Sequence, residues 1–153
     1  MSTWHRCLVL TAATIAACGL KTAPVAPELV QPRPATDLRA TSVASGVRLV
    51  WRRPTRYSGG GRMRDLERFA IERSDGDAAP FTSAGVLVLR DRYQLRQPAR
   101  LEWIDTTAVP GMQYRYRVVA VTLDGTASPP SDPARIRHRV VADDPDADDP
   151  DPS

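Results

Sequence analysis

The sequence contains no asparagine, one lysine, two cysteines and two histidines among its 153 residues. So few cysteines and histidines exclude a disulfide scaffold and a metal cluster built from these residue types. Aromatic residues make up 6% of the chain, whereas prolines number 14. This balance argues against a helical bundle and favours a turn-rich, all-β protein. The length fits one domain rather than two.

Residues 1–17 are typical of a secretory signal peptide. An uncharged stretch of eleven residues, Cys7 to Ala17, follows Arg6. It is too short to cross a bilayer as a helix, which takes about 20 residues, but it suits a signal peptide. The stretch closes with Ile-Ala-Ala-Cys18 and then Gly19. This motif resembles the bacterial lipobox, whose cysteine thiol accepts diacylglycerol. We therefore expect lipidation at Cys18.

Two other interpretations of this segment remain open. One is that Cys18 is an ordinary buried thiol, and the other is that the segment is the signal of a soluble protein with an Ala-x-Ala cleavage site.

If Cys18 is lipidated, the mature lipoprotein carries two or more acyl chains, which suffice for stable anchoring. Gly19 replaces the Asp that retains enteric lipoproteins in the inner membrane. The expected location is therefore the periplasmic face of the outer membrane.

The rest of the chain divides by composition into a tether, a domain and a tail. Residues 18–34 hold four prolines and no strand or helix periodicity, so we expect an extended tether at about 3.1 Å per residue, or up to about 50 Å for residues 19–34. Residues 35–141 are expected to form the domain. Residues 142–153 carry six aspartates and read as a disordered acidic tail. Asp144, Asp146 and Asp148 have the spacing of a calcium loop but lack its glycine, so weak divalent-ion binding stays an alternative.

Alternating apolar residues predict strands through the domain. The longest expected strand is 113–122, with Tyr114, Tyr116, Val118 and Ala120 on its inner face and the residues between them on its outer face, Val121 included. Seven strands over about 100 residues are typical of an immunoglobulin-like sandwich. The expected strands lie near residues 37–41, 47–52, 68–72, 85–89, 101–105, 113–122 and 134–140.

Several spaced motifs resemble a fibronectin type III domain. Val47-Arg-Leu-Val-Trp51-Arg-Arg-Pro54 resembles its strand B with the buried tryptophan, and Phe69 to Arg73 resembles strand C. Pro110-Gly-x-x-Tyr114 resembles the corner between strands E and F. The resemblance implies a seven-stranded sandwich over roughly residues 35–140. It also implies that the Tyr114 hydroxyl forms a hydrogen bond to the backbone upstream.

The inventory of reactive residues argues against an enzyme. There is no Gly-x-Ser-x-Gly, no phosphate-binding glycine loop and no His-Glu-x-x-His, and His138 is the one histidine after the signal. A pair of carboxylates is possible in principle, but the candidates fall on different strands. We expect no catalytic residue, cofactor, metal site or nucleic-acid partner. The candidate carboxylates are Glu67, Glu72, Glu102 and Asp105.

The resemblance implies that strands C, F and G are neighbours in one sheet, so arginines on their expected outer faces form a candidate binding patch. Residues 18–142 contain 20 basic and 12 acidic side chains. Arginine grips phosphate and carboxylate groups bidentately, so this patch could dock an anionic partner. The alternative is a solvated sheet face balanced in part by Glu72, and the acidic tail could compete for the same patch. The patch consists of Arg68, Arg115, Arg117, Arg135, Arg137 and Arg139.

These expectations combine into a non-catalytic binding or adaptor module held by lipid at the periplasmic face of the outer membrane. Its partner would be an envelope protein or a glycan. One alternative is a module that contacts carbohydrate or peptidoglycan, for which exposed rings of Tyr57 and Tyr93 would be needed. Another is a structural assembly factor of an envelope complex. Fold alone does not decide among these functions.

Overall fold

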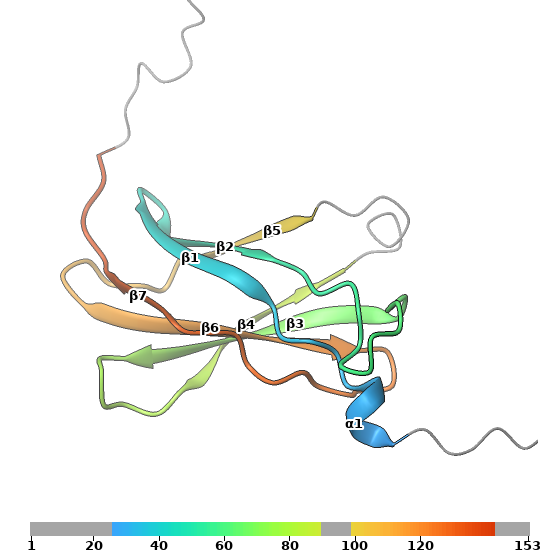
Figure 1. Ribbon diagram of the computed structural model, residues 1–153. Coiled ribbons are helices and arrows are strands. Elements are labelled where there is room, and N and C mark those ends of the chain that lie inside the picture. Colours follow the sequence, from blue (N-terminus) through green and yellow to red (C-terminus); the bar gives the residue numbers. More distant parts are fainter. Residues whose placement is uncertain (1–25, 90–98, 143–153) are drawn as a thin grey trace, which may run out of the picture.

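Two antiparallel β-sheets packed face to face make up the described part of the chain (Figure 1). The computed structural model describes residues 26–89 and 99–142. The first sheet has the order β1-β2-β5 and the second has the order β4-β3-β6-β7. The expected signal peptide, Cys18 and residues 143–153 of the tail lie outside the described residues. The elements are α1 (Pro27–Val30), β1 (Thr36–Val43), β2 (Gly46–Arg52), β3 (Leu66–Asp75), β4 (Thr82–Val88), β5 (Arg100–Asp105), β6 (Gln113–Thr122) and β7 (Ala134–Arg137).

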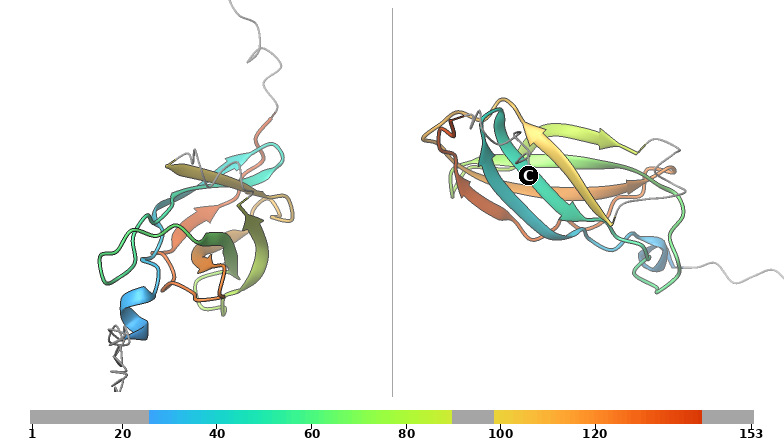
Figure 2. Two further views of the ribbon diagram at one scale, coloured as in Figure 1. Left: turned by 90° about the vertical axis from the view of Figure 1, so that its right-hand side faces the viewer. Right: turned by 90° about the horizontal axis from the view of Figure 1, so that it is seen from above.

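The seven-stranded sandwich predicted from the sequence is confirmed. Strands of the first sheet cross over those of the second at an angle, as the right-hand view of Figure 2 shows. The apolar alternation sets the packing, because successive side chains of a strand point to opposite faces. Trp51 of β2 meets Phe69 of β3 edge to face between the sheets, with ring centroids 5.4 Å apart. The inner faces of β2 and β6 are completely buried at Val47, Leu49, Trp51, Tyr116, Val118 and Ala120.

Three details of the strand predictions are wrong. The strand expected near residues 85–89 begins earlier, at Thr82, and ends at Val88. The last strand ends at Arg137 rather than at residue 140, because buried His138 turns in against the Ser42 hydroxyl. Val121, expected on the outer face, is buried. The register of β3 against β6 shifts near this residue, and Ala120, Val121 and Thr122 are all buried, so the alternation of inner and outer residues ends here.

The residues before β1 pack on the domain, which differs from the expectation of a free tether up to residue 34. α1 is a single helical turn, and Pro32 is fully buried. The carbonyl of Leu29 accepts a 3.0 Å hydrogen bond from the N–H of Gly59, and two further backbone bonds join residues 31 and 33 to residues 58 and 56. A Cβ at Gly59 would lie 2.8 Å from the Leu29 oxygen, so glycine is what permits this approach. Ordered packing therefore begins several residues before residue 35.

The described residues contain a single helix, α1, whose four residues are far fewer than a bilayer-spanning helix requires. In Figure 1, α1 and the end of β7 lie at opposite ends of the sandwich. The chain thus enters the domain at one end and leaves it at the other.

Replacing Trp51 tests the inner face of β2. Trp51→Ala is expected to lower the free energy of unfolding by roughly 3–5 kcal/mol, because it leaves a cavity between the sheets. Trp51→Phe should cost clearly less, since the indole N–H has no hydrogen-bond partner in the part of the chain that the structure describes. Urea denaturation of both variants measures the difference. Equal losses for Phe and Ala would contradict the packing described here.

Candidate functional site

The second sheet gathers four of the six predicted patch arginines on its outer face. Arg115 of β6 lies opposite Arg135 of β7, and Arg137 lies opposite Gln113. Arg117 follows on the same side of β6 because outward residues alternate. Arg135 and Arg137 are exposed, whereas Arg115 and Arg117 are half-buried. We call these four residues the arginine face.

The other two predicted patch residues do not join the arginine face. Arg68 lies opposite Val121 and Val88, separated along the sheet from the arginine face by the Ala70–Val119 pair, and its guanidinium contacts Glu67. Arg139 follows the end of β7, and its backbone N–H donates to the Ser42 hydroxyl of β1. The prediction of one patch of six arginines is therefore too broad.

Some of the guanidinium groups already have partners. Nε of Arg117 lies 2.5 Å from a carboxylate oxygen of Glu72, as the alternative interpretation of the patch anticipated. Arg135 has a longer contact of 3.7 Å with Asp77, and Nε of Arg137 donates to the Gly111 carbonyl at 3.3 Å, which leaves the two Nη groups of Arg137 exposed to other partners. Ion pairs at a surface are worth about 1 kcal/mol or less, so an anionic partner can replace them. Arg135 and Arg137 are the members of the arginine face that are most available.

Arg115 holds a loop in place, a role that the sequence did not reveal. Its Nε and Nη2 donate to the carbonyl oxygens of Gly76 and Ala79 at 3.1 and 3.0 Å, and Nη2 also donates to the Ser74 hydroxyl. These acceptors all belong to the end of β3 or to the loop between β3 and β4. Most of the hydrogen-bonding capacity of Arg115 is thus used within the domain.

Phe81 is a second residue of this face that sequence reasoning missed. Its half-buried ring lies under two guanidinium carbons, at 5.0 Å for Arg115 and 4.2 Å for Arg117. Such cation–π contacts are worth about 0.5–1 kcal/mol at exposed sites. They form only because the loop folds back over the sheet, and no spacing in the sequence signals that. Phe81 therefore links the side chains of Arg115 and Arg117 to the loop between β3 and β4.

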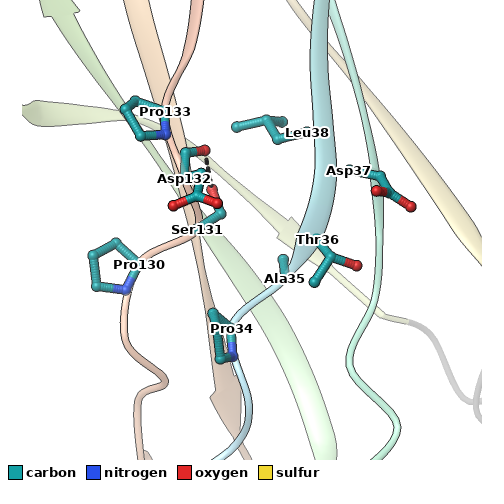
Figure 3. Close-up of a pocket in the computed structure, with 9 residues that line it drawn as sticks. All are labelled: Pro34, Ala35, Thr36, Asp37, Leu38, Pro130, Ser131, Asp132 and Pro133. Atoms are coloured by element: carbon teal, nitrogen blue, oxygen red, sulfur yellow. Dashed lines mark hydrogen bonds between the residues drawn. The ribbon is translucent and has the colours of Figure 1, made fainter.

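A groove of about 410 Å³ lies between the start of β1 and the segment that leads into β7 (Figure 3). One wall is the start of β1 with Asp37, and the other is the segment before β7, with Asp132 and Ser131. The Ser131 hydroxyl accepts from the Val118 N–H and donates to the Asp132 carbonyl, so it is engaged in the backbone. Asp37 is paired with Arg52. Three prolines line the remainder, and we assign no chemistry to this groove.

A buried carboxylate joins the two sheets at the end where β5 finishes. Asp105 of β5 is 1% exposed, and its two oxygens accept four hydrogen bonds. Arg73 of β3 donates at 2.9 Å, Tyr116 of β6 at 2.8 Å, and the N–H and hydroxyl of Thr107 at 2.9 and 2.6 Å. A buried charge is tolerated when it is paired and fully hydrogen-bonded. This cluster therefore links the two sheets.

The same contacts determine how these groups titrate. Burial alone would raise the pKa of Asp105, but the hydrogen bonds from Thr107, Arg73 and Tyr116 outweigh it and lower the pKa below its ordinary value. Burial and the bond to Asp105 raise the pKa of Tyr116. Burial opposes the charge on Arg73, yet its contacts with Asp105 raise its pKa on balance. Asp105 and Arg73 are therefore both charged at neutral pH.

The tyrosines divide between the core and a loop. The Val109 N–H donates to the Tyr114 hydroxyl at 2.9 Å, which confirms the predicted upstream bond at the E–F corner. Tyr57 is half-buried and its hydroxyl donates to Asp65. Burial and this bond raise the pKa of Tyr57 to about 12. Its ring is therefore fixed and not a free platform for sugars, and Tyr93 lies outside the described residues.

The carboxylates considered as a hydrolytic pair are engaged elsewhere or lie apart. Glu67 contacts Arg68, and Glu72 is paired with Arg117. Asp105 is the buried group described above, and Glu102 is exposed on β5 opposite Val50. Within residues 26–89 and 99–142, no group of three or more acidic, histidine or cysteine side chains is arranged to hold a metal ion.

Comparison with solved structures identifies the fold. The twitchin kinase region from C. elegans is similar, with a TM-score of 0.53 and 17% identity, and the match covers 72% of this chain and 17% of that one. Titin module A71 from human cardiac muscle has a TM-score of 0.52 and 19% identity, with 71% of this chain and 93% of that one covered. The chicken CNTN1 FN1-FN3 domains have a TM-score of 0.50 and 21% identity, with 71% of this chain and 33% of that one covered. The chain thus spans well under two thirds of the twitchin and CNTN1 chains. No family model and no curated protein matches the sequence. The described residues have the fold of a fibronectin type III domain, and at these identities the likeness concerns the fold alone.

Removing the Asp105 carboxylate is expected to destabilise the domain in a pH-dependent way. At neutral pH, Asp105→Asn should cost roughly 3–5 kcal/mol, because it leaves Arg73 without its buried partner. Since the folded-state pKa of Asp105 is lowered, this stabilisation is present above the ordinary aspartate pKa of about 3.9 and disappears as pH falls through the lowered value.

Urea denaturation from neutral to acidic pH measures this dependence as the gap between wild type and variant. The gap should be constant near neutrality and shrink below about pH 4. Asp75→Asn is the matched control, because it removes the exposed partner of the same arginine and should cost about 1 kcal/mol or less. A gap of the same size at every pH would show that Asp105 does not act through its charge.

Proposed function

We propose that this protein is a non-catalytic binding or adaptor module, anchored by lipid at Cys18 on the periplasmic face of a bacterial outer membrane. The observation that carries the binding role is the arginine face on the second sheet. Antiparallel strands carry all four arginines, Phe81 contacts Arg115 and Arg117, and the β3–β4 loop binds Arg115. A site on strands is positioned more precisely than one on loops.

The chemistry of this face favours an acidic protein surface as the partner. Exposed Arg135 and Arg137 present planar guanidinium groups that suit carboxylates bidentately. The Glu72 contact of Arg117 can be exchanged for a partner's carboxylate at little cost. The proposal of a glycan partner receives less support, because the ring of Tyr57 is already held by Asp65.

The anchor is tested by changing the proposed lipidation site. Cys18→Ala should move the protein from the membrane fraction to the soluble fraction, or leave its signal uncleaved, because the acyl chains are the anchoring element. Fractionation followed by mass measurement of the N-terminal peptide separates these outcomes. Unchanged membrane fractionation together with an unmodified Cys18 in the wild type would rule out the lipid anchor.

The arginine face is tested by removing its two most exposed charges. Arg135→Gln with Arg137→Gln should reduce recovery of cross-linked acidic partners from solubilised envelopes several-fold, and added salt should do the same to the wild type. Arg39→Gln with Arg48→Gln is the matched control, since it removes two exposed arginines from the first sheet. Equal losses for both double variants would mean that net charge, not this face, determines binding.

A further inference from the structure

A second group of arginines lies at the end of the sandwich where the chain enters the domain. Arg33 precedes β1, Arg53 follows β2, and Arg56 and Arg62 belong to the loop between β2 and β3. Arg33, Arg53 and Arg56 line a hollow of about 250 Å³. We call these four residues the arginine end. It is separate from the arginine face, which belongs to β6 and β7.

The arginine end brings like charges close together. Arg56 and Arg62 are direct partners in an isolated antiparallel bridge, a position in which like charges are destabilising. Burial lowers the pKa of the Arg53 guanidinium, and the charge of Arg62 lowers it further. Arginine remains charged at any physiological pH, so this repulsion persists in the free protein. A bound anion would relieve it.

Few of the described acidic side chains lie near enough to balance these charges. Among the described residues, no side chain of the arginine end forms an ion pair, and its one side-chain hydrogen bond runs from Arg56 to the Gly60 carbonyl. Asp65 and Asp124 lie near Tyr57 at this end, and the Tyr57 hydroxyl donates to Asp65. Asp37 near the hollow is paired with Arg52. The group therefore retains a positive field.

Exposed apolar side chains surround the same end. Leu29 and Val30 of α1 are 49% and 42% exposed. Leu123, which is 61% exposed, follows β6, and its N–H donates to the Asp65 carbonyl. Gln31 also donates to the Ala127 carbonyl, so the loop after β6 and the segment after α1 lie side by side. Cations mixed with exposed leucine and valine are typical of surfaces that contact membranes.

The length of chain before the domain brings this end close to the bilayer. Since residues 27–34 pack on the domain, only seven residues, 19–25, separate Cys18 from Ala26. Even with this stretch fully extended, the Cα atoms of Cys18 and Ala26 are at most about 29 Å apart. The three backbone hydrogen bonds of residues 29–33 join the entering chain directly to the loop that carries Arg56. An anchor at Cys18 would therefore hold the arginine end nearer to the membrane than any other part of the sandwich (Figure 1).

We propose that the arginine end docks on the anionic phospholipid headgroups of the membrane that anchors the protein. This inference rests on the proposed lipid anchor for its geometry. Arg33, Arg53 and Arg56 around the hollow receive headgroup phosphates, while Leu29, Val30 and Leu123 enter the interface. The second sheet then stands upright on the membrane, and the arginine face is left open at its side.

The test uses the lipidated full-length mature protein in nanodiscs with and without phosphatidylglycerol. The rate at which phenylglyoxal modifies each arginine is read by mass spectrometry. Modification of Arg53, Arg56 and Arg62 should be several-fold slower in the anionic discs, and high salt should remove the difference. Arg135 and Arg137 should react equally in both discs. Equal rates for the arginine end in both lipids would overturn the proposal.

Variants separate the site from net charge. Arg53→Gln, Arg56→Gln and Arg62→Gln together should abolish the lipid dependence at Arg33, whereas Arg135→Gln, Arg137→Gln and Arg139→Gln together should preserve it. If the first triple variant has a lowered melting temperature, Arg62→Gln alone takes its place, since it removes one exposed side chain. It should then reduce the lipid dependence of the modification rate at Arg33. Loss of the lipid dependence in the second triple variant would count against a defined site.

The outcome also distinguishes this proposal from failure of the anchor. If the intact mass shows no acyl chains, the proposed function fails, and the soluble protein is then sedimented with vesicles of the same two lipid compositions. The arginine end still predicts binding to the anionic vesicles, weakened about fivefold for each of its arginines replaced. If the protein is acylated and bound to the membrane but its arginine end is modified equally fast in both lipids, the docking proposal is overturned and the lipid anchor stands.

Discussion

The buried carboxylate of Asp105 is the constraint on which the arrangement of the two sheets depends. It belongs to the first sheet, whereas Arg73 and Tyr116, which donate to it, belong to the second. A charge this deep must keep its partners, so the sheets can meet only where these three side chains converge. Tyr116 must then point inward, and alternation along β6 sends Arg115 and Arg117 outward. The interaction that secures the core thereby also determines which residues form the outer surface.

Strand positions and the inner faces could be predicted from the sequence where every second residue is apolar. This holds for Val47 to Trp51 and for Tyr114 to Ala120, and the adjacency of strands C, F and G came from the resemblance to fibronectin type III domains. The roles of Arg115 and Phe81 could not be predicted, because they depend on a loop that folds back over the sheet. The packing of residues 27–34 on the domain could not be predicted either, because a proline-rich sequence is compatible with both a packed segment and a free linker.

The described domain is polarised in its chemistry. The arginine end combines guanidinium groups that lack ion pairs with exposed aliphatic side chains. On the arginine face, Phe81 and the β3–β4 loop contact some of the guanidinium groups. These surfaces share no residue and belong to different elements. Contact with a membrane and contact with a protein partner are thus compatible in the same molecule, because occupying one surface leaves the other accessible.

The backbone pairing of residues 29–33 with the loop before β3 also has a mechanical consequence. Tension applied to the chain before Ala26 is carried first by three hydrogen bonds and by buried Pro32, and reaches β1 only after they give way. Releasing this segment would add residues 27–34 to the free connection while both sheets stay intact. Under load, the segment is therefore expected to yield before the sandwich does.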